Sequence, residues 1–205
     1  MSKRIRRDED IYLTPHMLGT WDHENNKPIV VDQRNKHTLD PYNPSHKIEI
    51  YKDEVYGWFL EPAKRLIQST ERFQNSFVVL MICMAHIEGI QQYKQGESSN
   101  RQSSSFFKES IRTIFPSLDN LTIQKLDDIY AKVRCGLFHE SMVKDGVIFS
   151  YGFESPIHVI DDDIRINPRL LLEAIIDDFD TYITKLKNSF SEELTDNFKG
   201  RYNVI

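Results

Sequence analysis

The spacing of hydrophobic positions predicts a series of helices through most of the chain. Apolar residues recur every three or four positions in 55–67, and again in 106–115, 123–137 and 171–186, which is the spacing of one helical face. The segment 73–93 is apolar on nearly all sides through its middle, as is typical of a helix surrounded by others. The pattern therefore predicts a mainly α fold, a bundle of about five helices with 73–93 at its centre.

Two other parts of the chain lack this spacing. The N-terminal quarter holds four of the eight prolines and only short strand-like runs, which predicts an irregular arm with short strands at most. Asp145-Gly146, between two short β-branched runs, marks a tight turn and predicts a small β-hairpin before the last helix. Asn167-Pro168 supplies a capping residue and a first-turn proline for that helix. The predicted organisation is an arm at 1–52, a helical domain at 53–190 with the hairpin at 141–166, and a polar tail at 191–205.

Composition narrows the class of protein. Of the 205 residues, 40% are hydrophobic and 28% are charged, as in a folded globular chain. The longest wholly apolar run, 77–85, is shorter than the roughly 20 residues of a membrane-spanning helix, and no signal-peptide core follows the basic start. We therefore expect a protein that does not cross a membrane and resides in the cytoplasm. With only two cysteines, Cys83 and Cys135, a disulfide framework and a four-cysteine zinc site are excluded.

The densest group of chemically active residues lies at 133–140, where the sequence reads Val-Arg-Cys-Gly-Leu-Phe-His-Glu at the end of a predicted helix. An imidazole with a pKa near 6.5 exchanges protons at neutral pH, and a guanidinium holds a phosphate through two parallel hydrogen bonds. Such a pair suits phosphodiester cleavage without a metal ion or cofactor. In this hypothesis His139 moves the proton of a ribose 2′-hydroxyl or of the leaving oxygen, and Arg134 stabilises charge on the phosphoryl oxygens. The product would carry a 2′,3′-cyclic phosphate.

The charge balance limits how RNA could be bound. A net charge of −5 argues against a protein that coats nucleic acid through bulk electrostatics, but it leaves room for a small basic site. Lys132 and Lys144 flank the motif and are candidates for positioning a phosphate, while Glu88 on the apolar central helix is a candidate for orienting Arg134. Each has a simpler interpretation: lysines are usually solvated, and Glu88 would be one half of a satisfied polar pair.

The motif and its surroundings resemble the HEPN superfamily of small helical bundles over roughly 53–189. The phrase Arg-x-Gly-Leu-Phe-His, the turn that follows it and the helix led by Asn-Pro carry the resemblance, and Arg134 and His139 match the family's Arg-x4-His. The resemblance implies a metal-independent endoribonuclease that pairs as a homodimer, as in bacterial defence and toxin–antitoxin systems. The family also has catalytically silent members. In active members the residue after the arginine is often polar, and Cys135 at that position favours a silent relative slightly.

The spacing of the pair also predicts a dimer. On an α-helix, residues five apart point about 140° away from each other, so Arg134 and His139 of one chain would not share a face. A twofold homodimer that apposes the motif helices would bring both residues of both chains around one groove. Gly136 predicts either the close approach of another helix or an early helix end.

Simpler interpretations of the motif stay open. Arg134 would form a surface ion pair with an acid near it in the sequence, and His139 would cap the C-terminus of the helix. The acids within reach are Asp127, Asp128 and Glu140. The corresponding function is a non-catalytic helical module that binds RNA or a protein partner. A third interpretation is a regulator of a toxin–antitoxin pair, in which the arm wraps another chain.

No metal site or cofactor is predicted. The run Asp161-Asp162-Asp163 offers three carboxylates, but adjacent turn residues point in different directions. Cys83 and His86 are one helical turn apart, yet they lie in the most apolar segment and have no evident third and fourth ligands. The sequence contains no phosphate-binding glycine loop and no serine-hydrolase or zinc-protease motif.

Overall fold

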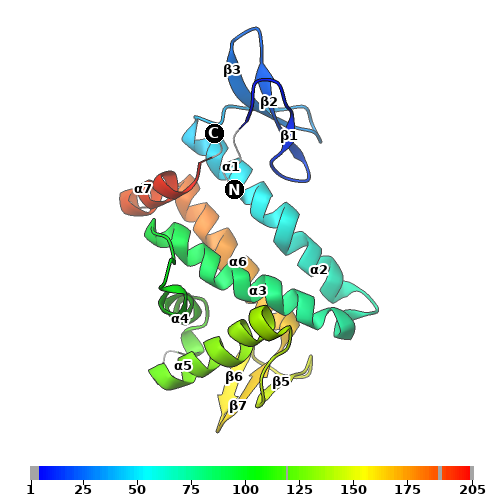
Figure 1. The fold of residues 1–205 in the computed structure, drawn as a ribbon, viewed down its shortest axis with the longest axis vertical. Coiled ribbons are helices and arrows are strands. Elements are labelled where there is room, and N and C mark those ends of the chain that lie inside the picture. The colour runs from blue at the N-terminus through cyan, green and yellow to red at the C-terminus, as the bar shows by residue number, and fades with distance from the viewer. Residues whose placement is uncertain (1–4, 119, 189–190, 204–205) are drawn as a thin grey trace. The chain divides into compact units, whose positions relative to one another are not determined.

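The computed structural model (Figure 1) describes residues 5–118, 120–188 and 191–203. Outside the described residues lie positions 1–4 of the predicted arm, 119 and 189–190 of the predicted helical domain, and 204–205 of the predicted tail. The chain divides into two compact units. Unit 1 comprises residues 1–62 and 182–205, and unit 2 comprises residues 63–181.

Unit 1 contains a four-stranded antiparallel sheet in the order β1-β2-β3-β4. Its strands are β1 (Ile11–Tyr12), β2 (Met17–Asp22), β3 (Lys27–Asp32) and β4 (Thr38–Leu39). β2 and β3 pair along their whole length, with Met17 opposite Asp32. Side chains alternate between the two faces, so that Met17, Val30 and Leu39 are fully buried. The predicted irregular arm is therefore wrong, because this segment forms a regular sheet.

The helices of unit 1 extend into both segments that were expected to lack them. The first three follow one another without a break: α1 (Pro44–Val55), the π-helix η1 (Tyr56–Leu60) and α2 (Glu61–Gln68), whose later residues belong to unit 2. Asn43 caps α1 by accepting hydrogen bonds from two N–H groups of its first turn. Ser191 caps α7 (Glu192–Arg201) by accepting a hydrogen bond from the N–H of Leu194. Phe198 of α7 packs against Tyr51 of α1, with ring centroids 5.3 Å apart.

Unit 2 is built around α3, which packs against α4 and η3. Its helical segments are α3 (Arg72–Gln95), α4 (Ser103–Ile114), the 3₁₀-helix η2 (Pro116–Leu118), α5 (Ile123–Ile129), the π-helix η3 (Tyr130–Glu140) and α6 (Pro168–Lys187), whose last residues belong to unit 1. Asn167 caps α6 by accepting the N–H groups of Arg169 and Leu170. The helices predicted from hydrophobic spacing around 73–93 and 171–186 are confirmed.

Unit 2 also contains a three-stranded mixed sheet in the order β5-β7-β6. Its strands are β5 (Val147–Phe149), β6 (Ile157–Ile160) and β7 (Asp163–Ile166). β5 runs parallel to β7, and β6 runs antiparallel to it. The tight turn at Asp145-Gly146 leads into β5 but joins no hairpin, whereas the turn at Asp161-Asp162 joins β6 to β7. The predicted single hairpin is therefore wrong.

The prediction of a mainly α fold is wrong. Helices make up 57% of the described residues, but each unit also contains a sheet, which makes the protein a mixed α and β structure. The sheets escaped detection because their strands are short: β1 and β4 have two residues each, and β5 has three. Strands of this length owe their stability to cross-strand pairing and burial rather than to local preference.

One helix of the described residues, α3, is long and apolar enough by length and composition to cross a membrane. Of its most apolar 18-residue stretch, 44% is buried inside the structure. The core helix of a soluble protein has the same properties. α3 buries one side against the rest of unit 2 and carries the buried acid Glu88, so we interpret it as such a core helix.

Candidate functional site

The Arg134 and His139 motif lies in η3, which continues α5 without a break. In a π-helix each backbone hydrogen bond joins residues five apart, so side chains at that spacing lie close to one face. The assumption of α-helical geometry, which set the two side chains about 140° apart, is therefore wrong. Arg134 and His139 of a single chain can face the same side, so the angular argument for a dimer no longer holds.

Gly136 lets the chain fold back over η3. The helix ends at Ser141, which has a left-handed φ of 58°, and its N–H donates to the carbonyl of Gly136. A β-carbon on Gly136 would lie 2.5 Å from the carbonyl oxygen of Met142 and 3.3 Å from the α-carbon of Val143. The close approach predicted for this glycine is thus made by the returning chain itself, not by another helix.

Arg134 is held by a buried acid of α3. Its Nη2 donates to Oε2 of Glu88 at 2.8 Å, and the Ser99 hydroxyl donates to Oε1 of Glu88 at 2.9 Å. The guanidinium also lies over the rings of Phe138 and Tyr130, 4.8 and 5.6 Å from their centroids. The predicted contact between Glu88 and Arg134 is confirmed, and 19% of the Arg134 side chain is exposed.

Two of the three acids proposed as simpler partners of Arg134 are engaged elsewhere, and the third, Asp128, forms no ion pair with Arg134 among the described residues. Asp127 accepts a hydrogen bond from Lys108 at 2.6 Å, and Glu140 forms an ion pair with Lys144 at 2.8 Å. In addition, Nε of Arg134 is buried and has no hydrogen-bond partner among the described residues. A buried donor without a partner costs about 1–3 kcal/mol, so such groups call for an explanation.

His139 lies in the last turn of η3. The residue is exposed, and within the described ranges its side chain makes no hydrogen bond or ion pair. The predicted capping contact is absent from this part of the chain, since the N–H of Ser141 closes the helix instead. The imidazole is therefore accessible to solvent and to a ligand.

Cys135 lies beside the half-buried phenol of Tyr130. Burial raises the pKa of Tyr130, the charge of Arg134 opposes that rise, and the thiol of Cys135 adds to it. Cys135 is half-buried. This residue therefore belongs to the packing around the guanidinium.

The two candidate lysines differ in availability. The hydrogen bond and charge of Glu140 raise the pKa of Lys144, so this ammonium group stays protonated and is paired with a carboxylate. Lys132 is half-buried, and its carbonyl accepts a hydrogen bond from the N–H of Lys144 at 3.0 Å, which fixes the returning chain. Of the two, only Lys144 forms an ion pair among the described residues.

The described residues contain no group of three or more potential metal ligands. Asp162 forms an ion pair with Lys125 at 2.8 Å. Cys83 and His86 belong to the core: burial raises the pKa of the Cys83 thiol and lowers the pKa of His86 to about 3. The ring of His86 packs edge to face on Phe179 at 5.4 Å, and its Nε2, shut away from solvent, lacks a partner in the described chain.

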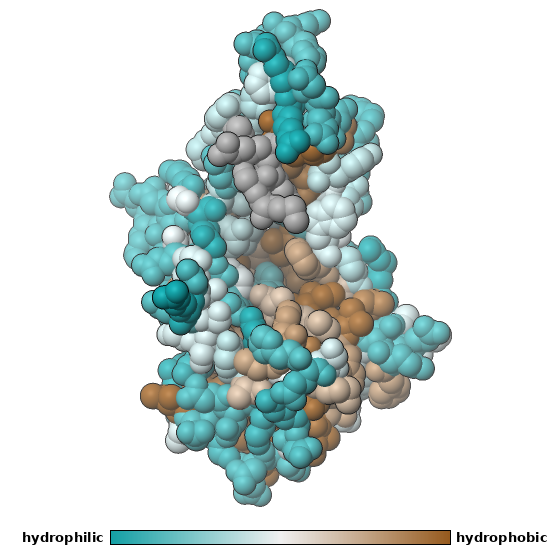
Figure 2. All heavy atoms as spheres, in the orientation of Figure 1, coloured by the Kyte–Doolittle hydropathy of each residue, from teal (hydrophilic) through white to brown (hydrophobic). Residues whose placement is uncertain are grey.

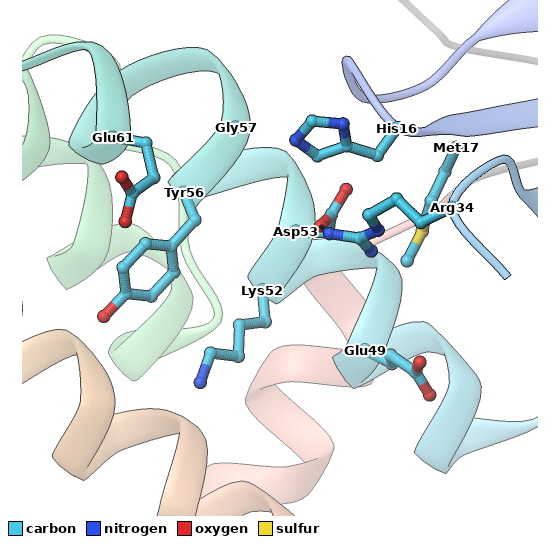
Figure 3. A pocket seen from close by; sticks show the side chains of 9 residues that line it. All are labelled: His16, Met17, Arg34, Glu49, Lys52, Asp53, Tyr56, Gly57 and Glu61. Atoms are coloured by element: carbon cyan, nitrogen blue, oxygen red, sulfur yellow. Dashed lines mark ion pairs between the residues drawn. The ribbon is translucent and has the colours of Figure 1, made fainter. Parts of the chain in front are cut away.

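Unit 1 contains a pocket of about 420 Å³ that the sequence did not indicate (Figure 3). Its lining consists of His16, Met17, Arg34, Glu49, Lys52, Asp53, Tyr56, Gly57 and Glu61. Figure 3 shows Arg34 reaching from the sheet toward Asp53 of α1, at an Nη1 to Oδ1 distance of 2.8 Å. Arg34 also donates two side-chain hydrogen bonds to the buried Asp32. The arginine of this pocket is therefore already occupied by two carboxylates.

Only the fold brings these pocket residues together. Arg34 and Asp53 are distant in sequence and belong to no recognisable motif, so no periodicity or spacing points to their ion pair. In comparisons with protein-family models, curated proteins and solved structures, no match was found for this chain.

Proposed function

We propose that this protein is a metal-independent endoribonuclease whose catalytic residues are Arg134 and His139. The observation that carries the proposal is the π-helical register of η3, which favours a shared face for an exposed imidazole and a firmly held guanidinium. The resemblance to the HEPN superfamily implies the same chemistry for this pair of residues. The proposed substrate is RNA, and the proposed compartment is the cytoplasm.

In the proposed reaction His139 takes the proton of a ribose 2′-hydroxyl, and the 2′-oxygen attacks the adjacent phosphorus. The bond from phosphorus to the 5′-oxygen of the next nucleotide breaks, and that oxygen takes up a proton from solvent water as it leaves, while the proton on His139 returns to solvent. Negative charge that develops on the non-bridging oxygens is stabilised by the guanidinium of Arg134. The products are a 2′,3′-cyclic phosphate and a 5′-hydroxyl.

Glu88 is the positioning residue in this scheme. Its contact occupies one edge of the guanidinium at Nη2, and the rings of Phe138 and Tyr130 restrict the arginine further. A preorganised guanidinium loses little conformational freedom when it meets a phosphate. We assign Lys132 to phosphate positioning, and Cys135 and Gly136 to the packing that holds η3.

The proposed assembly is a homodimer in which the two motif helices lie near each other. Because one chain can supply both catalytic residues on one face, dimerisation is not needed to bring Arg134 and His139 together. A dimer would instead widen the binding groove. A protein partner such as an antitoxin, in a bacterial defence system, would act by covering the exposed His139.

The proposal is tested by incubating a pool of structured RNAs with purified protein in excess EDTA and analysing the product ends. We expect cyclic phosphates from the wild type and none from His139→Ala. His158→Ala is the matched control, because His158 is also an exposed histidine of unit 2; this variant should cleave as the wild type does. Absence of cleavage by a folded wild-type protein would contradict the proposal and favour the non-catalytic binding module, in which the pairing of Arg134 with Glu88 is structural.

A further inference from the structure

A cluster of one arginine and two aromatic rings lies at the start of α3, apart from the catalytic pair. Phe73 is 65% exposed. The guanidinium carbon of Arg72 lies 5.5 Å from the ring centroid of Phe73 and 5.2 Å from that of Tyr151. The two rings meet edge to face at 5.1 Å. These three side chains, Arg72, Phe73 and Tyr151, form one surface, here called the aromatic platform.

Hydrogen bonds hold Tyr151 of the aromatic platform in place. The Tyr151 hydroxyl donates to the carbonyl of Arg72 and lies within hydrogen-bonding distance of the Ser76 hydroxyl, both at 2.9 Å. The carbonyl of Tyr151 accepts a hydrogen bond from the side chain of Asn167, which is fully buried. Rings held in this way lose little freedom when a ligand stacks on them.

The charge of the platform is not neutralised. No carboxylate in the described ranges of the chain forms an ion pair with Arg72, whereas Arg134 is paired with Glu88. Figure 2 shows hydrophobic side chains at the surface of one face of the molecule. The exposed large hydrophobic residues of α3 are Phe73, Val78 and Met81. An exposed ring beside an unpaired guanidinium offers a stacking face for a base and a contact for its phosphate.

We infer that the aromatic platform binds single-stranded RNA, with unpaired bases stacked on Phe73 and Tyr151 and a phosphate held by Arg72. This inference rests on the proposed function, because it assigns the substrate class of the same ribonuclease. Along α3, Arg72 and the catalytic arginine's partner Glu88 are about 24 Å apart, at 1.5 Å per residue. Single-strand binding sites of about 4–16 nucleotides extend over such distances. Duplex RNA keeps its bases stacked inside the helix and cannot use the platform.

The test measures binding in a His139→Ala background, so that the RNA stays intact. The probe is a fluorescein-labelled oligouridylate of about 12 nucleotides, a length within the usual range of single-strand sites, followed by fluorescence anisotropy. We expect Phe73→Leu to raise Kd about tenfold, because stacking on a ring is lost while an apolar side chain is kept. Arg72→Gln should lower the slope of log K against log salt by about 0.7, the value for one phosphate contact.

Phe59→Leu is the matched control, since Phe59 is a 48% exposed phenylalanine of η1 in unit 1 with no ring contact among the described residues. Its Kd should equal that of the parent protein. Equal Kd values for Phe73→Leu and Phe59→Leu would overturn the inference, and so would a Phe73→Leu variant that changes only the oligomeric state. If the wild type cleaves RNA while Phe73→Leu binds RNA as tightly as its parent, the proposed function is supported and RNA binding by the aromatic platform is contradicted. If Phe73→Leu binds weakly but the wild type never cleaves, the platform stands and the catalytic proposal fails.

Discussion

The two π-helical stretches, η1 in unit 1 and η3 in unit 2, are built alike but differ in the arginine that lies beside them. Each contains a glycine pressed against a crossing segment: a β-carbon on Gly57 would lie 2.6 Å from Cδ of Pro15, and one on Gly136 would lie 2.5 Å from the carbonyl oxygen of Met142. Near η1, Arg34 joins two carboxylates, whereas Arg134 of η3 has a single one.

This difference is the reason why Arg134, and not Arg34, is the arginine proposed to contact a substrate. The guanidinium of Arg34 donates hydrogen bonds to Asp32 and forms an ion pair with Asp53. Its hydrogen bonds hold the pKa of Asp32 below the ordinary value. Arg134 gives one edge to Glu88 and lies over the rings of Tyr130 and Phe138. A π-helix alone therefore does not indicate a functional site. An arginine beside it whose donors are not all paired with carboxylates is the better indication.

The largest expected effect concerns the arginine of η3. Arg134→Gln should lower the rate of RNA cleavage about 100-fold to 1000-fold, the range found when one donor to a developing oxyanion is removed. Arg34→Gln should leave the rate per folded molecule unchanged. Single-turnover cleavage rates, normalised to the folded fraction from circular dichroism, check both. Equal losses in the two variants would break the distinction between the arginines.

The arginine of unit 1 should instead matter for stability. Arg34→Gln leaves the carboxylate of Asp32 buried without its partner and should lower the free energy of unfolding by about 2 kcal/mol, less than for a fully buried pair because Arg34 is half-exposed. Urea denaturation measures the change. Adding Asp32→Asn to this variant should recover part of the loss, because the uncompensated charge is then removed. A loss below about 0.5 kcal/mol, typical of a surface pair, would contradict this interpretation.

The glycine of η3 should tolerate no side chain. Gly136→Ala forces the returning chain away from the helix and should destabilise unit 2 by about 1.5 kcal/mol, as overpacking does. Gly89→Ala in α3 is the matched control: a β-carbon there meets nothing within 4 Å, so the helix should gain about 0.5–1 kcal/mol. Thermal unfolding of both variants provides the measurement. Stabilisation by Gly136→Ala would show that the returning chain is not held against η3.

The smallest expected effect is a difference in acid sensitivity between the units. Burial lowers the pKa of His86 from 6.5 to about 3, so the unfolded state binds a proton first as the pH falls. Stability should therefore be complete above pH 6.5 and be lost progressively toward pH 3, by about 1 kcal/mol between pH 7.5 and 6. Asp32 of unit 1 has a lowered pKa, so its contribution is lost only below its ordinary value of 3.8. Urea denaturation at several pH values measures the free energy of unfolding as a function of pH. This free energy should change less with pH in His86→Leu than in the wild type. The same pH dependence in both proteins would contradict a lowered pKa for His86.

Hydrophobic periodicity was enough to predict the long helices. α3 and α6 span many turns, so their apolar faces repeat often enough to be recognised. The ion pair of Glu88 with Arg134 could also be predicted from the sequence, because a lone acid on an apolar helix needs a partner.

The remaining features depend on contacts distant in sequence. The pairing of β2 with β3 fixes strands whose own pattern is weak, and the register of a π-helix is a matter of backbone hydrogen bonds that the side-chain pattern does not reveal. The ion pair of Arg34 with Asp53 likewise forms only when sheet and helix meet. For this reason the sequence pointed to Arg134 and His139, but not to the geometry that relates them.

The most direct measurement is a double-mutant cycle on the cleavage rate in excess EDTA, comparing the wild type, Arg134→Gln, His139→Ala and the double variant. Residues that act as one unit are non-additive, so we expect the double variant to be no slower than the slower single variant. All cleavage products should end in a 2′,3′-cyclic phosphate. Losses that multiply would contradict a single catalytic unit, and a wild-type protein that cleaves no RNA would contradict the enzyme itself.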